Sequence, residues 1–219
     1  MEDLKHLALE AFRSSLMRGF ENQVMSLGYV NLAGVDEAGR GSLAGPVVAA
    51  AVIMTPDHTI PGIDDSKRLS AAERLALAPL IRQTSVASAI GVVSAAVIDR
   101  GNILRATRQA MLEALDSLDP APDCAIVDAV KLPRRNFSCL SLVRGDIVSY
   151  SVACASILAK VERDRLMVEL DEIYPQYGFS RNKGYGAAEH RAALRVYGPT
   201  PFHRLTFRSV IPKVTEVVH

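Results

Sequence analysis

The sequence contains no tryptophan, and only 5% of its 219 residues are aromatic. Ala, Val, Leu and Ile must therefore fill any core, which is feasible because 49% of the residues are hydrophobic. The longest apolar run, residues 43–54, is too short to span a membrane and contains Gly45 and Pro46. The N-terminus has early acidic residues and no continuous apolar segment, so it does not resemble a signal peptide. We expect a soluble, cytoplasmic protein without membrane contact.

Cysteine is scarce, and no two cysteines have the spacing of a metal site. Cys124, Cys139 and Cys154 form no CxxC pair, and each has apolar neighbours. This pattern indicates buried free thiols in a reducing compartment rather than disulfides or a zinc site. A GxxxxGK[ST] motif is also absent, which disfavours a nucleotide-hydrolysing P-loop.

Net charge is low, at +1, and by itself indicates neither a nucleic-acid-binding protein nor an acidic surface. Basic residues nevertheless gather near the C-terminus, where Glu189 is the only acid between residues 174 and 213. The basic residues of this segment are Arg181, Lys183, Arg191, Arg195, Arg204, Arg208 and Lys213. Such an excess suits binding of a polyanion, although a solvated basic face accounts for it equally well.

Hydrophobic periodicity predicts an α/β protein with helices covering a sheet. Strands are expected at about 30–35, 47–54, 85–94, 124–127 and 137–143. Helices are expected at the N-terminus and at about 71–82, 102–117, 149–174 and 187–196. Ser70 and Glu73 form a capping box at the start of one helix. The N-terminal helix is predicted to be amphipathic from its apolar positions Leu4, Leu7, Leu9, Phe12, Leu16 and Phe20.

Acidic residues stand where predicted strands end. Asp36 and Glu37 end the first strand, Asp128 ends the fourth, and Asp146 precedes the long helix. Strand ends at one sheet edge gather into a crevice, and four carboxylates there would repel unless cations lay between them. Oxygen ligands suit Mg²⁺ or Mn²⁺, which assist phosphoryl chemistry. Singly, the acids also suit an ordinary turn, a polar strand end or a helix N-terminal charge.

The segment directly after these acids combines two glycines and an arginine, Gly39-Arg40-Gly41. Glycine permits an unusual φ and lets a ligand approach backbone N–H groups closely. Arg40 is suited to bidentate contact with a phosphate. A tight hairpin would require the same residues, so this loop alone is weak evidence.

Five ordered segments resemble bacterial ribonuclease HII, the type 2 ribonuclease H. They are GVDEAGRGSLAGPVVAAAVI (34–53), DDSKRLS (64–70), GDIVSYSVACASILAKVERDR (145–165), YPQYGFSRNKGYG (174–186) and HRLTF (203–207). The resemblance covers most of the chain from about residue 30 to 210. It implies a ribonuclease-H-like mixed five-stranded sheet flanked by helices, with an N-terminal helical extension (1–28), a catalytic domain (29–212) and a C-terminal helical extension.

The resemblance further implies an endonuclease that depends on Mg²⁺ or Mn²⁺ held by Asp36, Glu37, Asp128 and Asp146. Such an enzyme cuts the RNA strand of RNA–DNA hybrids and nicks duplex DNA on the 5′ side of an embedded ribonucleotide. The products carry 3′-hydroxyl and 5′-phosphate ends. The basic C-terminal segment would then bind the duplex, with salt-dependent affinity. The expected partners are these duplexes, and the expected state is a monomer.

Substrate contacts are implied by the same motifs. Gly39, Arg40 and Gly41 would grip the backbone around the ribonucleotide and read its 2′-hydroxyl. Tyr185 would pack on the following deoxyribose, in a loop that also carries Lys183. Lys67 is expected to contact a phosphate with help from Ser66. Taken without the resemblance, Tyr185 could belong to the core, although the flanking Lys183, Gly184 and Gly186 favour an exposed loop, and Ser66 and Lys67 could be surface residues without a role.

Some positions depart from the family pattern. Ser42 replaces a common proline, Asn182 a frequent histidine, Ala187 a frequent threonine, and Ala129 the usual glycine. None of these changes removes an acid, although they leave substrate preference open. Ribonuclease HIII shares the acidic opening and is the second choice. It is the weaker one, because ribonuclease HIII usually lacks the GRG element and has an additional N-terminal domain. The presence of all four acids disfavours a hybrid-binding protein that has lost its activity. If the resemblance is left aside, the residues suggest a phosphate-binding regulatory module.

Overall fold

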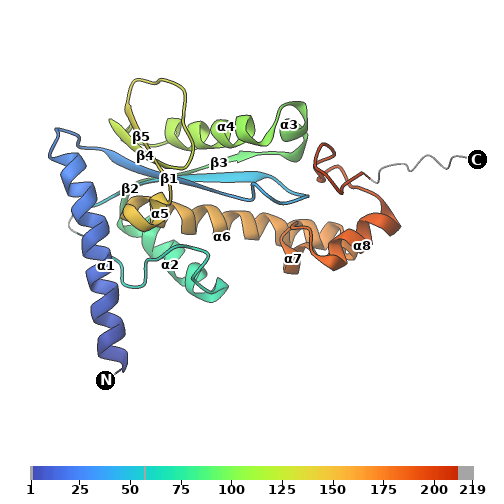
Figure 1. Cartoon of the computed structure of the whole chain (residues 1–219), viewed down its shortest axis with the longest axis horizontal. Helices are drawn as coiled ribbons and strands as arrows, with labels where there is room; N and C mark the ends of the chain where they lie inside the picture. Colours follow the sequence, from blue (N-terminus) through green and yellow to red (C-terminus); the bar gives the residue numbers. More distant parts are fainter. Residues whose placement is uncertain (1, 57, 212–219) are drawn as a thin grey trace, which may run out of the picture.

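A five-stranded mixed sheet lies at the centre of the computed structural model, which describes residues 2–56 and 58–211 (Figure 1). The strands are β1 (Leu32–Ala38), β2 (Val47–Met54), β3 (Ser85–Val93), β4 (Cys124–Asp128) and β5 (Ser138–Leu142), in the order β3-β2-β1-β4-β5. β1 is antiparallel to β2 and parallel to β4. The predicted mixed sheet is thereby confirmed. Lys213 and the end of the predicted domain at residue 212 lie outside the described residues.

Helices cover both faces of the sheet. α4 (Ile103–Asp116) packs on one face and α6 (Tyr150–Ile173) on the other, with α2 (Ala71–Thr84) beside α6 (Figure 1). The remaining helical elements of the described chain are α1 (Glu2–Met25), α3 (Ala95–Arg100), α5 (Gly145–Val148), η1 (Pro175–Tyr177), α7 (Phe179–Asn182) and α8 (Ala188–Tyr197). No described helix has the length and apolar character needed to cross a bilayer.

Small residues allow the helices to approach the sheet closely. A Cβ atom added to Gly34 of β1 would lie 2.2 Å from the backbone of Ser151 and Val152. On the other face, a Cβ atom at Gly91 would lie 2.0 Å from the carbonyl oxygen of Ala110. These spacings are far below van der Waals contact, so glycine is required at both positions. The first of them fixes the start of α6 directly behind β1.

Two expectations from the sequence are corrected. Cys139 is exposed, because it lies on β5 at the edge of the sheet, whereas Cys124 and Cys154 are buried. In α1 the apolar positions Leu4, Leu9, Phe12 and Leu16 are all exposed. Its buried side chains are instead Ser14, Met17, Arg18 and Glu21, and the side chain of Leu7 lies outside the described set.

Polar contacts hold α1 to the rest of the protein. Arg13 forms an ion pair with Asp64 at 2.7 Å. Glu21 accepts hydrogen bonds from the Ser149 hydroxyl and the Ser151 amide, both at 2.6 Å. A buried carboxylate needs such donors, since an unpaired one would cost several kcal/mol, on the order of 5, to desolvate. The helix therefore packs through these polar positions together with Met17, Phe20, Val24 and Met25.

Candidate active site

Asp36 and Asp128, two acids of the candidate site, lie side by side on neighbouring parallel strands. Val35 of β1 pairs with Val127 of β4, so Asp36 and Asp128 are the next residues at the same sheet edge. Asp36 is 6% exposed, and its Oδ1 accepts the Glu37 amide at 2.7 Å. Asp36 and Glu37 thus lie within the last residues of β1, paired with Ala50 and Ala49 of β2, and Asp36 stands beside Asp128.

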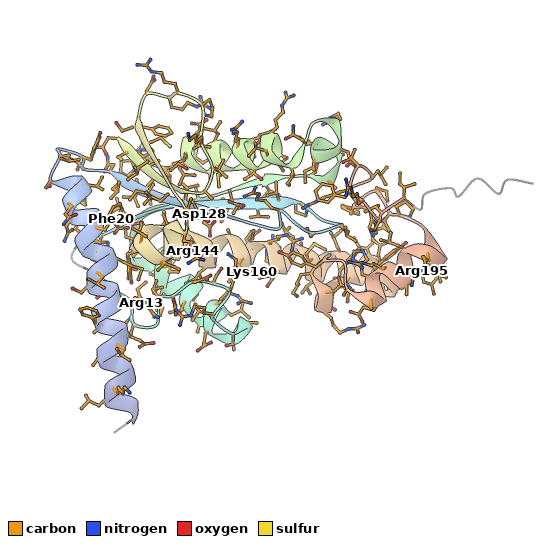
Figure 2. All side chains as sticks on the ribbon, in the orientation of Figure 1. Arg13, Phe20, Asp128, Arg144, Lys160 and Arg195 are labelled. Atoms are coloured by element: carbon orange, nitrogen blue, oxygen red, sulfur yellow. The ribbon has the colours of Figure 1, made fainter. Side chains whose placement is uncertain are left out.

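Asp146 reaches this edge through α5. The Gly145 amide donates a hydrogen bond to Asp128 Oδ1 at 2.7 Å, which attaches the start of α5 to the end of β4. Asp146 follows in the first turn of this short helix and is 5% exposed. Figure 2 shows Asp128, the last residue of β4, above α5 and the start of α6.

The carboxylates influence one another. Burial raises the pKa of Asp36 well above its ordinary value, and the charges of Glu37, Asp128 and Asp146 add to the rise. Burial also raises the pKa of Asp146, with further contributions from Asp65 and Asp128. Burial raises the pKa of Glu37, although the Arg40 guanidinium opposes the rise. We therefore treat the predicted acids as one electrostatic unit, the acid cluster (Asp36, Glu37, Asp128 and Asp146).

The loop before α2 brings Lys67 and an unpredicted acid, Asp65, to this cluster. Partial burial lowers the Lys67 pKa, but the carboxylates of Asp65, Asp36 and Asp146 outweigh burial and leave the pKa raised. The ammonium group therefore lies within the field of the acids. Asp65 also lies against Asp146. The sequence offered one signal for its inclusion in the site, since Asp65 precedes Ser66 and Lys67 in the DDSKRLS motif.

The donor set of the acid cluster suits a hard divalent cation. Glu37 Oε2 is buried without a hydrogen-bond partner, and the neighbouring carboxylates raise the pKa of Asp36. In the described part of the chain, however, no three Asp, Glu, His or Cys side chains form a ready-made cation site. Asp36 and Asp128 are each hydrogen-bonded to a backbone amide, and Glu37 Oε1 lies 3.2 Å from the Arg40 guanidinium. Binding an ion would require these side chains to rotate toward each other.

The GRG loop (Gly39-Arg40-Gly41) follows the acids at the end of β1. Gly39 has a φ of +92°, and a Cβ atom there would lie 1.9 Å from Arg163 Nε. Glycine is thus required at this position for two reasons, the positive φ and the lack of space for a Cβ atom. Gly41 has no positive φ, and nothing lies within 4 Å of the space that its Cβ atom would occupy. Gly39 thus uses the unusual φ that glycine permits, whereas Gly41 offers open space beside its backbone.

Two buried arginines hold the GRG loop from behind. Arg163 of α6 donates to the Ser42 hydroxyl at 2.7 Å and to the Lys183 carbonyl at 2.9 Å. Arg204 donates to the carbonyl oxygens of Gly39 at 2.7 Å and of Arg40 at 2.8 Å. Arg204 was predicted to belong to a basic binding surface, but it is 0% exposed because these carbonyls surround it. Sequence reasoning missed this bracing role of both arginines.

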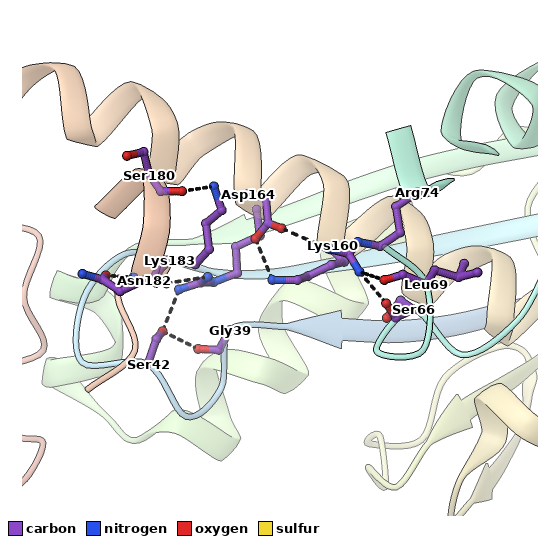
Figure 3. A network of polar contacts seen from close by, with 12 residues as sticks. Gly39, Ser42, Ser66, Leu69, Arg74, Lys160, Asp164, Ser180, Asn182 and Lys183 are labelled. Carbon is purple, nitrogen blue, oxygen red and sulfur yellow. Dashed lines mark hydrogen bonds and ion pairs between the residues drawn. The ribbon is translucent and has the colours of Figure 1, made fainter. Parts of the chain in front are cut away.

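Ser42 and Asn182 have contacts that explain two of the departures from the family pattern. The Ser42 hydroxyl donates to the Gly39 carbonyl at 2.9 Å while accepting from Arg163 (Figure 3). The Asn182 side chain donates to the Tyr177 carbonyl at 2.7 Å and accepts from the Gly184 amide at 2.8 Å. Both side chains brace a turn by hydrogen bonds, and both were noted in the sequence without a role.

The other predicted contact residues differ in their surroundings. Tyr185 is 42% exposed, and its ring centre lies 5.4 Å from the Arg163 guanidinium carbon. Lys183 Nζ donates to the Ser180 carbonyl at 2.6 Å, so its ammonium group is tied to its own turn (Figure 3). Ser66 is buried, and Arg74 donates to its carbonyl at 2.7 Å. Of the three, only Tyr185 presents an exposed functional group.

The rest of the basic C-terminal segment is exposed but scattered. Arg191, Arg195 and Arg208 are exposed, and Arg181 forms a 2.9 Å ion pair with Glu189. Arg195 on α8 lies far from Asp128, toward one end of the molecule, whereas Asp128 lies near its middle (Figure 2). Any duplex that contacts both would therefore have to lie along the length of the protein.

Comparison with known proteins identifies the class first. The structure resembles that of ribonuclease H2 from Pyrococcus horikoshii OT3, with a TM-score of 0.70 and 24% identity, covering 83% of this chain and 95% of that one. It also resembles Bst-RNase HIII in complex with Mn²⁺, with a TM-score of 0.65 and 22% identity, covering 85% and 70%. The protein thus has the fold of the type 2 ribonucleases H.

The family follows from the sequence. The Ribonuclease HII family model matches residues 33–210. The ribonuclease HII of Geobacter sulfurreducens is 51% identical over 191 residues, which cover 87% of this chain and 88% of that protein. The chain belongs to the ribonuclease HII family. It is an endonuclease of the ribonuclease H class, whose substrate is the RNA strand of RNA–DNA hybrids.

Proposed function

We propose that the acid cluster hydrolyses the phosphodiester on the 5′ side of a ribonucleotide, within a hybrid or embedded alone in duplex DNA. The products would carry 3′-hydroxyl and 5′-phosphate ends. The observation that carries this proposal is the direct succession of Asp36, Glu37 and the GRG loop at one sheet edge. Groups suited to phosphate chemistry and a backbone suited to sugar recognition thus lie within a few residues of each other.

Asp36, Glu37, Asp128 and Asp146 would hold Mg²⁺ or Mn²⁺. Such ions polarise a phosphoryl oxygen and lower the pKa of a bound water. The residues of the chain supply the positioning. The unpaired Glu37 Oε2 offers a free ligand atom, and Lys67 provides a positive charge beside the cluster for a phosphate. Arg40 would exchange its ion pair with Glu37 for a substrate phosphate.

The sugar contacts would come from the GRG loop and Tyr185. Because Arg204 occupies the carbonyl oxygens of Gly39 and Arg40, the loop is fixed before substrate arrives. Its open side at Gly41 leaves space for a ribose and its 2′-hydroxyl. The exposed Tyr185 ring would pack on the next deoxyribose, while Lys183 and Ser66 would support their loops and contact phosphates at most indirectly.

We further infer that residues 29–212 form the catalytic unit, with residues 1–28 as a helical extension, and that the enzyme acts as a monomer. The basic C-terminal segment would bind the duplex through Arg191, Arg195 and Arg208. Three free cysteines support a reducing, cytoplasmic location.

A cleavage assay with matched variants tests the catalytic proposal. A duplex with one ribonucleotide is incubated with wild type, Asp36→Asn and Asp116→Asn in Mg²⁺, Mn²⁺ or EDTA. Asp116 is an exposed acid outside the cluster, paired with Arg135, and serves as control. We expect cleavage by wild type and Asp116→Asn with either metal, none in EDTA, and a loss of at least about 100-fold in Asp36→Asn. Metal-independent cleavage, or full activity of Asp36→Asn, would contradict the proposal.

A further inference from the structure

Two buried histidines form a hydrogen-bonded pair beside Tyr185. His190 Nε2 and His203 Nε2 lie 3.0 Å apart, and both residues are almost fully inaccessible to solvent. The rings of Tyr177 and Phe179 pack against both imidazoles. We call His190 and His203 the histidine bridge. Neither residue belongs to the acid cluster or to any substrate contact proposed above.

The partners at the two ends of the bridge determine where its protons lie. The Thr200 amide donates to His203 Nδ1 at 2.9 Å, so this nitrogen carries no proton. Neutral His203 therefore carries its proton on Nε2 and donates it toward His190 Nε2. His190 must then be protonated on Nδ1, which lies 2.8 Å from the Tyr185 carbonyl oxygen and donates to it. Every donor along this chain meets an acceptor, provided that both rings are neutral.

The bridge connects the two segments that are proposed to read the substrate. On one side, the two neighbours of His203 hydrogen-bond to the backbone just after the GRG loop. The Arg204 amide donates to the Leu43 carbonyl, and the Phe202 carbonyl accepts from the Gly45 amide, both at 2.8 Å. On the other side, His190 holds the Tyr185 carbonyl. The Leu43 amide also donates to the Gly184 carbonyl at 2.8 Å, so the two segments are hydrogen-bonded to each other directly as well as through the histidines.

We propose that the histidine bridge is a positioning device that fixes Tyr185 relative to the GRG loop and thereby sets the preference for a ribonucleotide followed by deoxyribose. This inference rests on the proposed role of Tyr185. The second contact of the Tyr185 carbonyl, a hydrogen bond from the Ala187 amide, is local to the turn and does not connect it to the GRG loop. His190 and His203 therefore provide a side-chain connection that ends on the Tyr185 carbonyl itself, in addition to that of Arg163, which ends on the Lys183 carbonyl.

Two substitutions at position 190 separate the functions of its ring nitrogens. His190→Asn keeps a donor near the position of Nδ1, within reach of the Tyr185 carbonyl, and loses the contact with His203. His190→Gln keeps an acceptor near the position of Nε2, facing His203, and loses the donor to Tyr185. Tyr185→Ala removes the ring itself. The measured quantity is kcat/KM on duplex DNA with one ribonucleotide, divided by kcat/KM on a uniform RNA–DNA hybrid.

We expect Tyr185→Ala to lower this ratio and His190→Gln to lower it about 3- to 10-fold, the worth of one hydrogen bond. His190→Asn should lower it less than His190→Gln. Combining His190→Gln with Tyr185→Ala should give no further loss beyond Tyr185→Ala alone, since both act through one ring. Equal losses on both substrates, with the ratio unchanged in His190→Gln, would overturn the proposal and leave a purely structural pair.

The outcomes also separate this inference from the function on which it rests. If Tyr185→Ala leaves the ratio unchanged, the proposed role of Tyr185 fails first. If it lowers the ratio and His190→Gln does not, only the histidine bridge fails. Imidazole ¹⁵N spectra of the wild type test the bridge without any variant. They should show His203 protonated on Nε2 and His190 on Nδ1 at neutral pH, and the opposite tautomers or a charged ring would overturn it.

Discussion

Arg163 Nη2 lies 2.7 Å from Ser42 Oγ, and this hydrogen bond joins the middle of α6 to the loop that follows β1. The same guanidinium also donates to the carbonyls of Ala44, Pro46 and Lys183. Arg163 has no carboxylate partner among these contacts and is 0% exposed. It holds the segment after β1 and the turn at Lys183 in place by hydrogen bonds to their backbone oxygens and to the Ser42 hydroxyl.

Replacing Arg163 should therefore be costly. Arg163→Lys keeps the charge but cannot reach these acceptors together, and each buried acceptor left unpaired costs about 1–3 kcal/mol. We expect the free energy of unfolding to fall by about 3 kcal/mol or more, measured by urea denaturation. The control is Arg165→Lys, two positions along the same helix, whose side chain is exposed and paired with Glu162 and Glu169. Equal stability of the two variants would show that the buried contacts matter little.

The two glycines of the GRG loop should respond differently to alanine. Gly39→Ala places a Cβ atom against Arg163 at a φ of +92°, and the backbone conformation alone costs about 1–3 kcal/mol. Gly41→Ala meets open space and should leave the thermal unfolding midpoint nearly unchanged. Its methyl group would nevertheless occupy the proposed ribose position, so kcat/KM should fall. Full activity in Gly41→Ala would argue against ribose binding at this point.

Acid should weaken the folded state through the histidine bridge. Burial, with a smaller contribution from the neighbouring His190, lowers the pKa of His203 from an ordinary value of 6.5 to about 4. The unfolded chain therefore binds a proton at a higher pH than the folded one. The neutral His203 ring contributes fully to the free energy of unfolding above about pH 6.5. This contribution is lost as the pH falls toward about 4, and the free energy of unfolding then falls by at most about 1.4 kcal/mol per pH unit.

Urea denaturation at several pH values measures this slope, and His203→Gln removes the titrating ring. The stability of the variant should depend less on pH between 6.5 and 4 than that of the wild type, whatever its absolute stability. Glu189 is the acid that acts on the bridge, and it opposes the effect of burial on the pKa of His190. Parallel pH curves for the two proteins would contradict the assignment of a neutral pair.

Lys67 should contribute to duplex affinity through a phosphate. Binding is measured in the Asp36→Asn background, without cleavage, over a range of salt concentrations. Removing one phosphate contact should reduce the slope of log K against log salt by about 0.9. Arg68→Ala is the control, because Arg68 is the exposed neighbour and lies 3.5 Å from Asp64. An unchanged slope in Lys67→Ala, or the same change in both variants, would remove Lys67 from the contact surface.

The sequence patterns were sufficient for the strands, the long helices and the capping box of Ser70 and Glu73, because all of these depend on local spacing. Short helices such as α3 and α5 were missed, since four to six residues carry too little periodicity. Cys139 was misjudged because an apolar strand does not reveal whether it lies at a sheet edge.

In the candidate site, the motifs pointed to the acids, the GRG loop and Tyr185, which are short-range features. The bracing contacts could not be predicted, because Arg204 meets Gly39 across 165 positions of the chain and Glu21 meets Ser149 across 128. Charge alone placed Arg204 on a surface, whereas the carbonyls that it binds are backbone atoms without a sequence signature. Such contacts depend on the tertiary fold.

The most direct test of the whole account compares two duplexes that differ by a single oxygen atom. One contains a ribonucleotide at a defined position, and the other a deoxyribonucleotide at the same position. With Mg²⁺ or Mn²⁺, the account predicts one cut on the 5′ side of the ribonucleotide, leaving 3′-hydroxyl and 5′-phosphate ends, and no cut in the other duplex. Cleavage of both duplexes, or a cut on the 3′ side of the ribonucleotide, would contradict the proposal that the GRG loop reads the 2′-hydroxyl and the acid cluster cuts on the 5′ side.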